Sequence, residues 1–219
     1  MSTEPSAATR PPSLTERRKA ATQYDIARAA AELFTERGPD GTTAEEIALR
    51  AGVALRTFYR YFRSKQDAVG PLLAIGGGDW RERLAGAGPG AGLRRALESA
   101  VTASLTVPHE ARAEGLRWTR GLLRAAAEDP ALRAVWYRMN RESEDELVPV
   151  VARLAGEGAD PLEIRLAAAA ATDAIRVALE TWAESDAGLE GPGSPADLAV
   201  RCLRELTGSL GLLTDPRTP

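Results

Sequence analysis

Prolines mark the beginnings of several long segments in which apolar residues recur at helical spacing. Pro108, Pro130, Pro161 and Pro195 stand at or just before such segments, where the missing N–H of proline costs a helix little. The spacing predicts five helices in the C-terminal part of the chain, at 93–106, 110–128, 130–155, 161–185 and 195–213. Ala, Leu, Arg and Glu abound, whereas strand-building residues are scarce. The sequence therefore predicts an all-α fold.

Glycine and proline also predict where the helices are interrupted. Pro149 falls inside 130–155, and because proline removes a backbone donor, this helix should kink or break there. Gly76-Gly77-Gly78 predicts a hinge, and the glycine-rich run 86–92 predicts a loop. We therefore expect a flexible tail rich in Pro, Ser, Thr and Ala, a small domain and a larger helical domain, at residues 1–13, 14–66 and 67–215.

The small domain contains two short helices on either side of a glycine turn. A first helix is expected from about Thr15 to Arg37, where a Gly-Pro-Asp-Gly sequence ends it. The capping box at 43–46 opens a second helix, and the tight turn at 51–53 separates it from a third at about Leu55–Phe62. A further cap motif at 64–67 predicts the start of a fourth. The order of the second and third helices is typical of a helix-turn-helix.

The third helix combines an apolar face with side chains that can donate hydrogen bonds. Val53, Phe58 and Phe62 fall on one side and can pack against the first two helices. The side chains left to point outward or sideways are Arg56, Thr57, Tyr59, Arg60 and Tyr61. The major groove of B-DNA, about 12 Å wide, admits a helix, and arginine and tyrosine donate to phosphates and base edges. We therefore expect this helix to bind double-stranded DNA.

The charge distribution points the same way. Residues 10–66 hold 11 Lys and Arg against 7 Asp and Glu, a net charge of +4, whereas residues 67–219 hold 17 against 23, a net charge of −6. A basic end on an acidic body is expected when one end meets an anionic polymer. A chance fluctuation of a few charges would produce the same asymmetry.

The stretch from Tyr24 to Leu72 resembles the N-terminal domain of the TetR family of transcriptional regulators. The resemblance is carried by IARAAAELF at 26–34, Gly38, TTAEEIA at 42–48, AGV at 51–53, TFYRYF at 57–62 and Ser64-Lys65. Where the family often has a serine before the third helix, this chain has Ala54, and no contact is expected there.

The resemblance implies a set of DNA contacts. Thr42 and Thr43 match phosphate contacts, and Arg56 and Thr57 match positions near base edges. Tyr59 and Tyr61 match contacts to the groove wall and to phosphates, and Lys65 matches a phosphate-binding lysine. Arg60, at a variable position on the same helix, completes the set that we expect to bind the operator.

A palindromic operator presents two half-sites, and the resemblance implies that a homodimer reads them. In the family the last two long helices of each subunit pair with the same helices of the partner. In this chain they would be the predicted helices at 161–185 and 195–213. They carry the apolar residues Leu162, Leu166, Ala169, Ala170, Ala174, Val177, Trp182, Leu198, Cys202, Leu206 and Leu210. Both stripes could equally face the core of one monomer.

The resemblance also implies a pocket in the larger domain for a small, partly apolar effector. Residues there with large apolar faces or polar tips are Arg117, Trp118, Trp136, Tyr137, Met139, Asp173 and Trp182. A tryptophan on an amphipathic helix is more often a core residue. Asp173 would need a partner if buried, and could equally form a surface pair with Arg176.

Other function classes find little support. The single His109 and the single Cys202 have nothing that orients them, and there is no phosphate-binding loop, zinc-binding HExxH or CxxC motif. We therefore expect no enzyme, no cofactor and no metal site. The sequence contains no run of 18 apolar residues, so we expect no membrane-spanning helix. Residues 1–12 lack the apolar core of a secretion signal. These features favour the cytoplasm.

The sequence thus predicts a ligand-responsive transcriptional regulator, most often a repressor in the family it resembles. It would bind a palindromic operator as a dimer and be released by a small molecule. The alternatives are an activator or architectural helix-turn-helix protein without a ligand, and an interaction module that has lost DNA binding.

Overall fold

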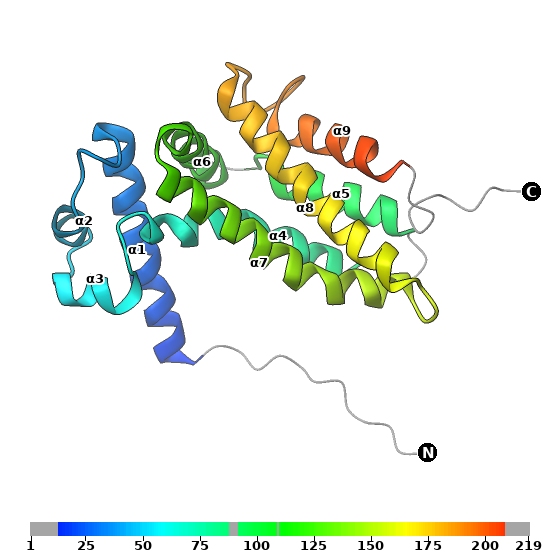
Figure 1. The fold of residues 1–219 in the computed structure, drawn as a ribbon, viewed down its shortest axis with the longest axis horizontal. Coiled ribbons are helices and arrows are strands. Elements are labelled where there is room, and N and C mark those ends of the chain that lie inside the picture. Colours follow the sequence, from blue (N-terminus) through cyan, green and yellow to red (C-terminus); the bar gives the residue numbers. More distant parts are fainter. Residues whose placement is uncertain (1–12, 88–91, 109, 209–219) are drawn as a thin grey trace, which may run out of the picture.

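A computed structural model of the chain describes residues 13–87, 92–108 and 110–208 (Figure 1). All regular elements in these ranges are helices, so the predicted all-α fold is confirmed. Helices α1 (Leu14–Arg37), α2 (Ala44–Arg50) and α3 (Leu55–Tyr61) lie at one end, and the others form an elongated body. Of the expected flexible tail, residues 1–12 lie outside the described residues, and Ser13 is the N-cap of α1.

The N-terminal helices enclose a small apolar core. Ile26 and Leu33 of α1, Ile47 of α2 and Phe58 of α3 are at most 1% exposed. Gly52 forms the turn between α2 and α3 with a φ of 68°, and nothing lies within 4 Å of the position that its Cβ would occupy. The turn therefore requires glycine for its left-handed backbone and not for lack of space.

The connection to the body differs from the prediction in two places. Ser64 Oγ accepts a hydrogen bond from the Asp67 amide at 3.1 Å, but this cap opens a 3-10 turn, η1 (Asp67–Val69), and α4 (Gly70–Ala85) follows it. The hinge expected at Gly76–Gly78 is wrong, because α4 runs through these glycines. Trp80 and Leu84 are almost fully buried further along α4, and their burial offsets a helix penalty of about 1 kcal/mol per glycine.

The helices of the body begin and end close to the predicted residues. They are α5 (Leu93–Leu105), α6 (Glu110–Glu128), α7 (Pro130–Ala155), α8 (Pro161–Glu184) and α9 (Pro195–Thr207). The predicted end of the last helix, at 213, lies outside the described residues, as do residues 88–91 of the predicted loop. The break expected at Pro149 does not occur. Its neighbours Leu147 and Val151 are fully buried, and this packing holds α7 together.

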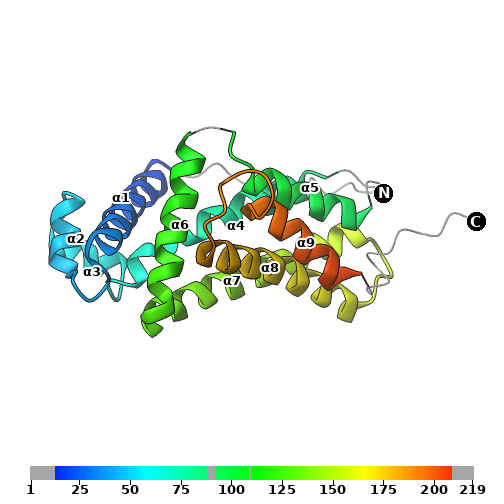
Figure 2. The same cartoon turned by 90° about the horizontal axis from the view of Figure 1, so that it is seen from above.

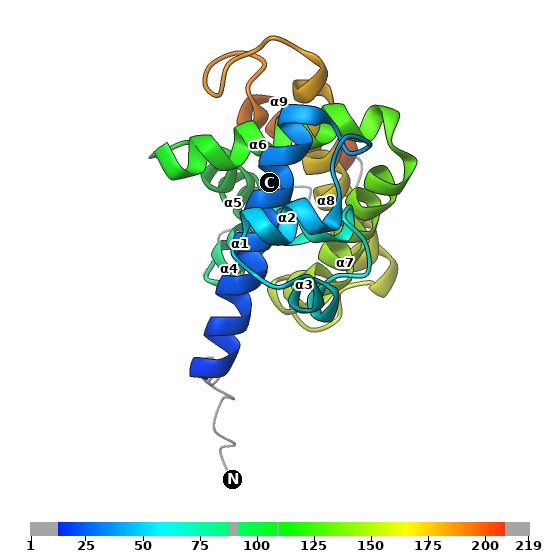
Figure 3. The same cartoon turned by 90° about the vertical axis from the view of Figure 1, so that its left-hand side faces the viewer.

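Helix α6 lies crosswise between α1 and the rest of the body (Figure 2), in contact with α1, α7 and α8. The approach to α1 is close, because a Cβ added to Gly121 of α6 would lie 3.0 Å from Thr35 Oγ1 of α1. Seen end on, the first turns of α1 project past the other helices (Figure 3), and Ser13 to Ala21 are all exposed.

Polar contacts also join the N-terminal domain to the body. Gln66 Nε2 donates to Asp129 Oδ2 at 3.0 Å, and Arg138 Nη2 lies 2.7 Å from Asp67 Oδ1. Asp129 is in addition the N-cap of α7, where Oδ1 accepts the amides of Ala131 and Leu132 at 2.8 and 3.0 Å. The segment after α3 is therefore fastened to the start of α7.

Candidate nucleic-acid interface and internal cavity

Helix α3 separates its apolar and polar side chains onto different faces. Phe58 is fully buried and Phe62 is 6% exposed, with their ring centroids 5.8 Å apart, whereas Tyr59 is 54% exposed. Arg56 and Arg60 are exposed as well. The rings of Phe58 and Tyr59 meet edge to face with their centroids 5.3 Å apart, which holds the exposed tyrosine against the buried phenylalanine. Helix α3 thus presents a fixed row of donors to solvent.

Two of the predicted contacts on α3 point sideways. Tyr61 is half-buried against the core, and its hydroxyl accepts a hydrogen bond from Arg60 Nη2 at 3.1 Å. The Arg60 guanidinium also lies 4.8 Å from the centre of the Tyr61 ring. Thr57 is half-buried. As expected, Ala54 precedes α3 without any side-chain cap.

The two threonines at the start of α2 have different roles. Thr42 is 1% exposed, and its hydroxyl donates to the carbonyls of Gly38 at 3.0 Å and Leu33 at 3.3 Å. Its side chain is therefore not available to a phosphate, and the prediction for Thr42 is wrong. Thr43 is exposed and is the N-cap of α2, with the predicted capping box to Glu46 in place. The Thr43 amide donates a hydrogen bond to the Glu46 carboxylate, and this bond holds the pKa of Glu46 below its ordinary value.

Lys65 is half-buried and already has partners within the chain. Its Nζ donates to the carbonyl oxygens of Pro39 at 2.7 Å and Thr42 at 3.0 Å. An ammonium group has three donors, so one of them remains for a phosphate. Lys65 therefore fastens the loop between α1 and α2, and any contact with DNA would come in addition.

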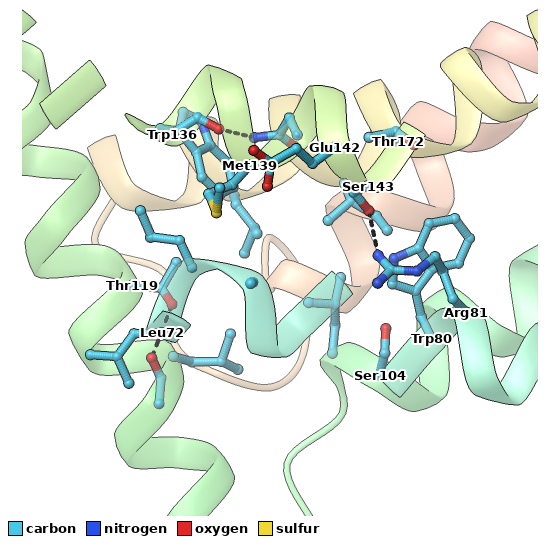
Figure 4. Close-up of a pocket in the computed structure, with 18 of the residues that line it drawn as sticks. Leu72, Trp80, Arg81, Ser104, Thr119, Trp136, Met139, Glu142, Ser143 and Thr172 are labelled. Carbon is cyan, nitrogen blue, oxygen red and sulfur yellow. Dashed lines mark hydrogen bonds between the residues drawn. The ribbon is translucent and has the colours of Figure 1, made fainter. Parts of the chain in front are cut away.

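A cavity of about 380 Å³ lies inside the body (Figure 4). Helices α4 to α8 supply most of its wall, which is mainly apolar and includes Leu72, Leu105, Leu116, Trp136, Met139 and Ile175. Tyr24 of α1 also lines it. The cavity thus reaches from the body to a helix of the N-terminal domain.

The structure brings two of the predicted pocket residues to this cavity. Trp136 and Met139 line it, and Trp136 Nε1 donates to Glu180 Oε1 at 2.7 Å, which fixes the indole. Tyr137 and Asp173 instead line a more polar pocket between α7 and α8. There Asp173 makes the surface pair that the sequence left open, with Arg176 Nε 2.9 Å from Asp173 Oδ1.

The other three predicted pocket residues do not line the cavity. Trp182 is fully buried in the core, where its Nε1 donates to the carbonyls of Ala187 and Gly188, and the Arg120 guanidinium stacks 3.8 Å from its ring centre. Burial lowers the pKa of Arg120, and the nearby Arg124 adds to this effect. Arg117 is exposed and pairs with Glu110 at 2.6 Å, and Trp118 packs against the core from outside.

Several cavity residues escaped the sequence prediction. Tyr24, Trp80, Arg81, Ser104 and Thr119 come from four different helices. Trp80 has the same sequence signal as the three tryptophans predicted for the pocket, a large apolar face on a helix. No local pattern distinguishes the others from surface residues, because their shared position depends on how the helices cross.

Part of α8 and α9 forms an exposed apolar face. Leu162, Leu166 and Val177 of α8 are 62%, 44% and 36% exposed, and Leu206 of α9 is 47% exposed. Ala174 and Trp182, which were predicted on the same stripe, are instead fully buried in the monomer core. Helix α8 therefore has one face inside the monomer and another free to pack elsewhere. In the described part of the chain, no helix has the length and apolar character needed to span a bilayer.

Both parts of the chain match known families. Residues 26–69 match the family described as bacterial regulatory proteins, tetR family, and residues 92–206 match the MftR C-terminal domain. The chain is also 32% identical over 155 residues to the HTH-type transcriptional regulator TcmR of Streptomyces glaucescens. That alignment covers 68% of this chain and 66% of the relative, slightly less than two thirds of its length.

Solved structures share the fold at lower sequence identity. The TetR family repressor AlkX from Dietzia sp. strain DQ12-45-1b, which is implicated in biodegradation of n-alkanes, has a TM-score of 0.55 and 19% identity, with 87% of this chain and 98% of that chain covered. The multidrug binding protein EbrR, solved with imidazole, has a TM-score of 0.53 and 19% identity over 90% of this chain and 97% of its own.

Proposed function

The chain belongs to the TetR family of bacterial regulatory proteins, and on that premise we propose that it is a ligand-responsive repressor that binds a palindromic operator as a homodimer. Family membership makes it a transcriptional regulator with a DNA-binding helix-turn-helix. The proposal adds the sign of regulation, the symmetry of the operator and release by a small molecule. The place of action would be the cytoplasm, where the operator lies.

The two-faced helix α3 is the observation that carries the proposal. A helix that reads DNA must be held by one face and must offer donors from the other. Phe58 and Phe62 hold α3, and Arg56 and Tyr59 are free to reach the duplex. An exposed tyrosine ring between two exposed arginines on a short helix is unusual for a surface that only meets water. On a DNA backbone, arginine and tyrosine supply directed hydrogen bonds.

The exposed face of α8 and α9 supports the homodimer. Leu162, Leu166 and Leu206 would each lose contact with water if a second copy covered them, and burying a leucine side chain contributes about 1.5–3 kcal/mol. For such a homodimer to bind one duplex, its two-fold axis must bring both α3 helices to the same face of the DNA. Half-sites one helical turn apart need reading helices about 34–36 Å apart.

The cavity supports a ligand-responsive protein over the alternative of an activator or architectural protein without a ligand. Its 380 Å³ falls in the range of sites for small molecules. Tyr24 lies both in the cavity wall and on α1, which packs against α2 and shares one apolar core with Phe58 of the reading helix. A ligand that favours one arrangement of α1 and α4 would change operator affinity by linkage.

The proposal can be tested by measuring binding to duplexes that tile the DNA upstream of the chain's own gene, by fluorescence anisotropy at several salt concentrations. We expect one palindromic duplex to bind with a Kd in the range of about 10⁻⁸ to 10⁻¹¹ M at physiological salt. Its affinity should fall linearly on a log–log plot against salt. Equal, weak affinity for all duplexes would contradict the proposal.

A further inference from the structure

We infer that the cavity takes a mainly apolar ligand with one acidic group, such as a carboxylate, and that Arg81 receives this group. The inference rests on the proposed role of the cavity as an effector site and names the chemistry of the effector. It comes from an ion pair in the cavity wall whose two partners differ in their exposure to water.

Arg81 is the fixed partner of this pair. It lies on α4, lines the cavity, and donates from Nη1 to Ser143 Oγ of α7 at 2.9 Å (Figure 4). Its second nitrogen, Nη2, pairs with the carboxylate of Glu146, also on α7. The Arg81 side chain is only 20% exposed, so the loss of its negative partner would leave a poorly solvated charge and would cost free energy.

Glu146 is the replaceable partner. Its side chain is 61% exposed, so it can turn away from Arg81 into water and remain fully solvated. A ligand carboxylate that enters the cavity can then take its place on Arg81. The planar guanidinium holds a carboxylate through two parallel hydrogen bonds, so the exchange leaves the charge of Arg81 neutralised.

The rest of the wall determines the remainder of the ligand. Leu72, Leu105 and Ile175 leave an apolar interior that a charged or strongly polar molecule would not fill. Glu142 also lines the cavity and would attract a cationic ligand, but it is exposed and its charge is solvated. The two arginines of the wall, Arg81 and Arg112, are partly withdrawn from water, whereas its two glutamates are exposed, and therefore an acid is favoured over an amine.

The exchange would also act on the helices. Arg81 belongs to α4, which leads to the N-terminal domain, and Glu146 belongs to α7. When the ligand replaces Glu146, the ion pair between α4 and α7 is lost. The hydrogen bond from Arg81 to Ser143 still joins the two helices, but with the ion pair gone they can shift more easily, which would give an acidic ligand a means to alter operator binding.

Three probes of equal chain length test the inference: decanoic acid, 1-decanol and decylamine, titrated calorimetrically into the full chain at pH 7 without DNA. We expect the acid to bind at least about tenfold more tightly than the other two, because only its carboxylate can form charge-assisted hydrogen bonds with Arg81. Arg81→Gln should abolish this preference, whereas Glu146→Gln should strengthen acid binding because the competing carboxylate is gone. Arg133→Gln, on an exposed part of α7, is the matched control and should change nothing.

Circular dichroism melting checks that each variant is folded. Equal binding of the three probes, tighter binding of the amine, no binding at millimolar concentration, or an unchanged preference in Arg81→Gln would overturn the inference. Because calorimetry is done without DNA, it tests the acid site independently of the proposed regulatory function. If the operator is bound and a compound other than an acid releases it, the proposed function stands and the inference about the acid fails. If the acid binds but no operator is found, the inference stands and the proposed function fails.

Discussion

At the scale of single residues, position along α3 decides what each side chain does. Phe58 and Tyr59 are neighbours in sequence, and yet one ring is fully buried and the other is 54% exposed. Arg60 donates a hydrogen bond to the Tyr61 hydroxyl, whereas the exposed Arg56 side chain makes no hydrogen bond or ion pair with the described residues. Arg56 is therefore the arginine best placed to reach a base edge.

Arg56→Ala should lower the affinity for the operator more than the affinity for random DNA. If Arg56 reads a guanine, the loss is about 1–3 kcal/mol and one position of the operator becomes degenerate. Competition binding against operators with single base changes measures this. An equal loss on operator and random duplexes would instead assign Arg56 to a phosphate.

Lys65→Ala should lower both stability and DNA affinity. The Lys65 ammonium donates hydrogen bonds to the carbonyls of Pro39 and Thr42. The loss of one hydrogen bond from a charged group costs about 1.5–3 kcal/mol. Urea denaturation measures the stability, and the salt dependence of binding should fall by about one unit of slope if the third donor meets a phosphate. Lys19→Ala, at an exposed position of α1, is the control for stability. Unchanged stability in Lys65→Ala would contradict the structural role.

At the scale of elements, the helices follow from local signals. The N-caps of α7, α8 and α9 are Asp129, Asp160 and Ser194, and each is followed directly by a proline. A capping residue followed by proline predicts a helix start from the sequence alone. The hinge predicted at Gly76–Gly78 is absent because the low helix propensity of glycine costs less free energy than the burial of Trp80 gains.

The cavity could not be predicted in the same way. Trp182 has the large apolar side chain with a polar tip that is expected of a pocket residue, but it lies in the core. Arg81 reaches the cavity because α4 packs against α7. Likewise, the burial of Thr42 depends on the carbonyls of Leu33 and Gly38, which only the folded chain brings near its hydroxyl. Contacts between elements distant in sequence leave no local pattern.

Asp129→Ala should destabilise the junction between the domains in a pH-dependent manner. Burial raises the pKa of Asp129, but hydrogen bonds from Gln66 and from the amides of Leu132 and Ala131 outweigh it and lower the pKa. The stabilisation is thus fully present above the ordinary pKa of an aspartate and is lost as the pH falls through the lowered value.

Thermal melting between pH 7 and pH 2.5 measures this effect. At pH 7 the variant should be less stable by about 1–2 kcal/mol, in line with the loss of a helix cap, and the difference should shrink at the acid end. Asp160→Ala removes the cap of α8 without touching the N-terminal domain and serves as the control. A difference that stays constant with pH would contradict the assignment.

At the scale of the whole molecule, the account requires two copies. Leu166→Glu places a charge in the middle of the exposed apolar face of α8, and burying that charge in a homodimer would be costly. We expect the variant to be a folded monomer in sedimentation experiments and to bind the operator at least about a hundredfold more weakly. Ala127→Glu, at an exposed site on α6, should remain dimeric. A Leu166→Glu dimer would show that another surface joins the copies.

Two copies of α3 are expected to read one duplex, and this can be tested by selecting bound sequences from a random pool of DNA duplexes. The account predicts that the selected sequences are palindromes, with half-site centres about one helical turn, or a multiple of it, apart. Enrichment of a single unsymmetrical site, or no enrichment over the starting pool, would contradict it.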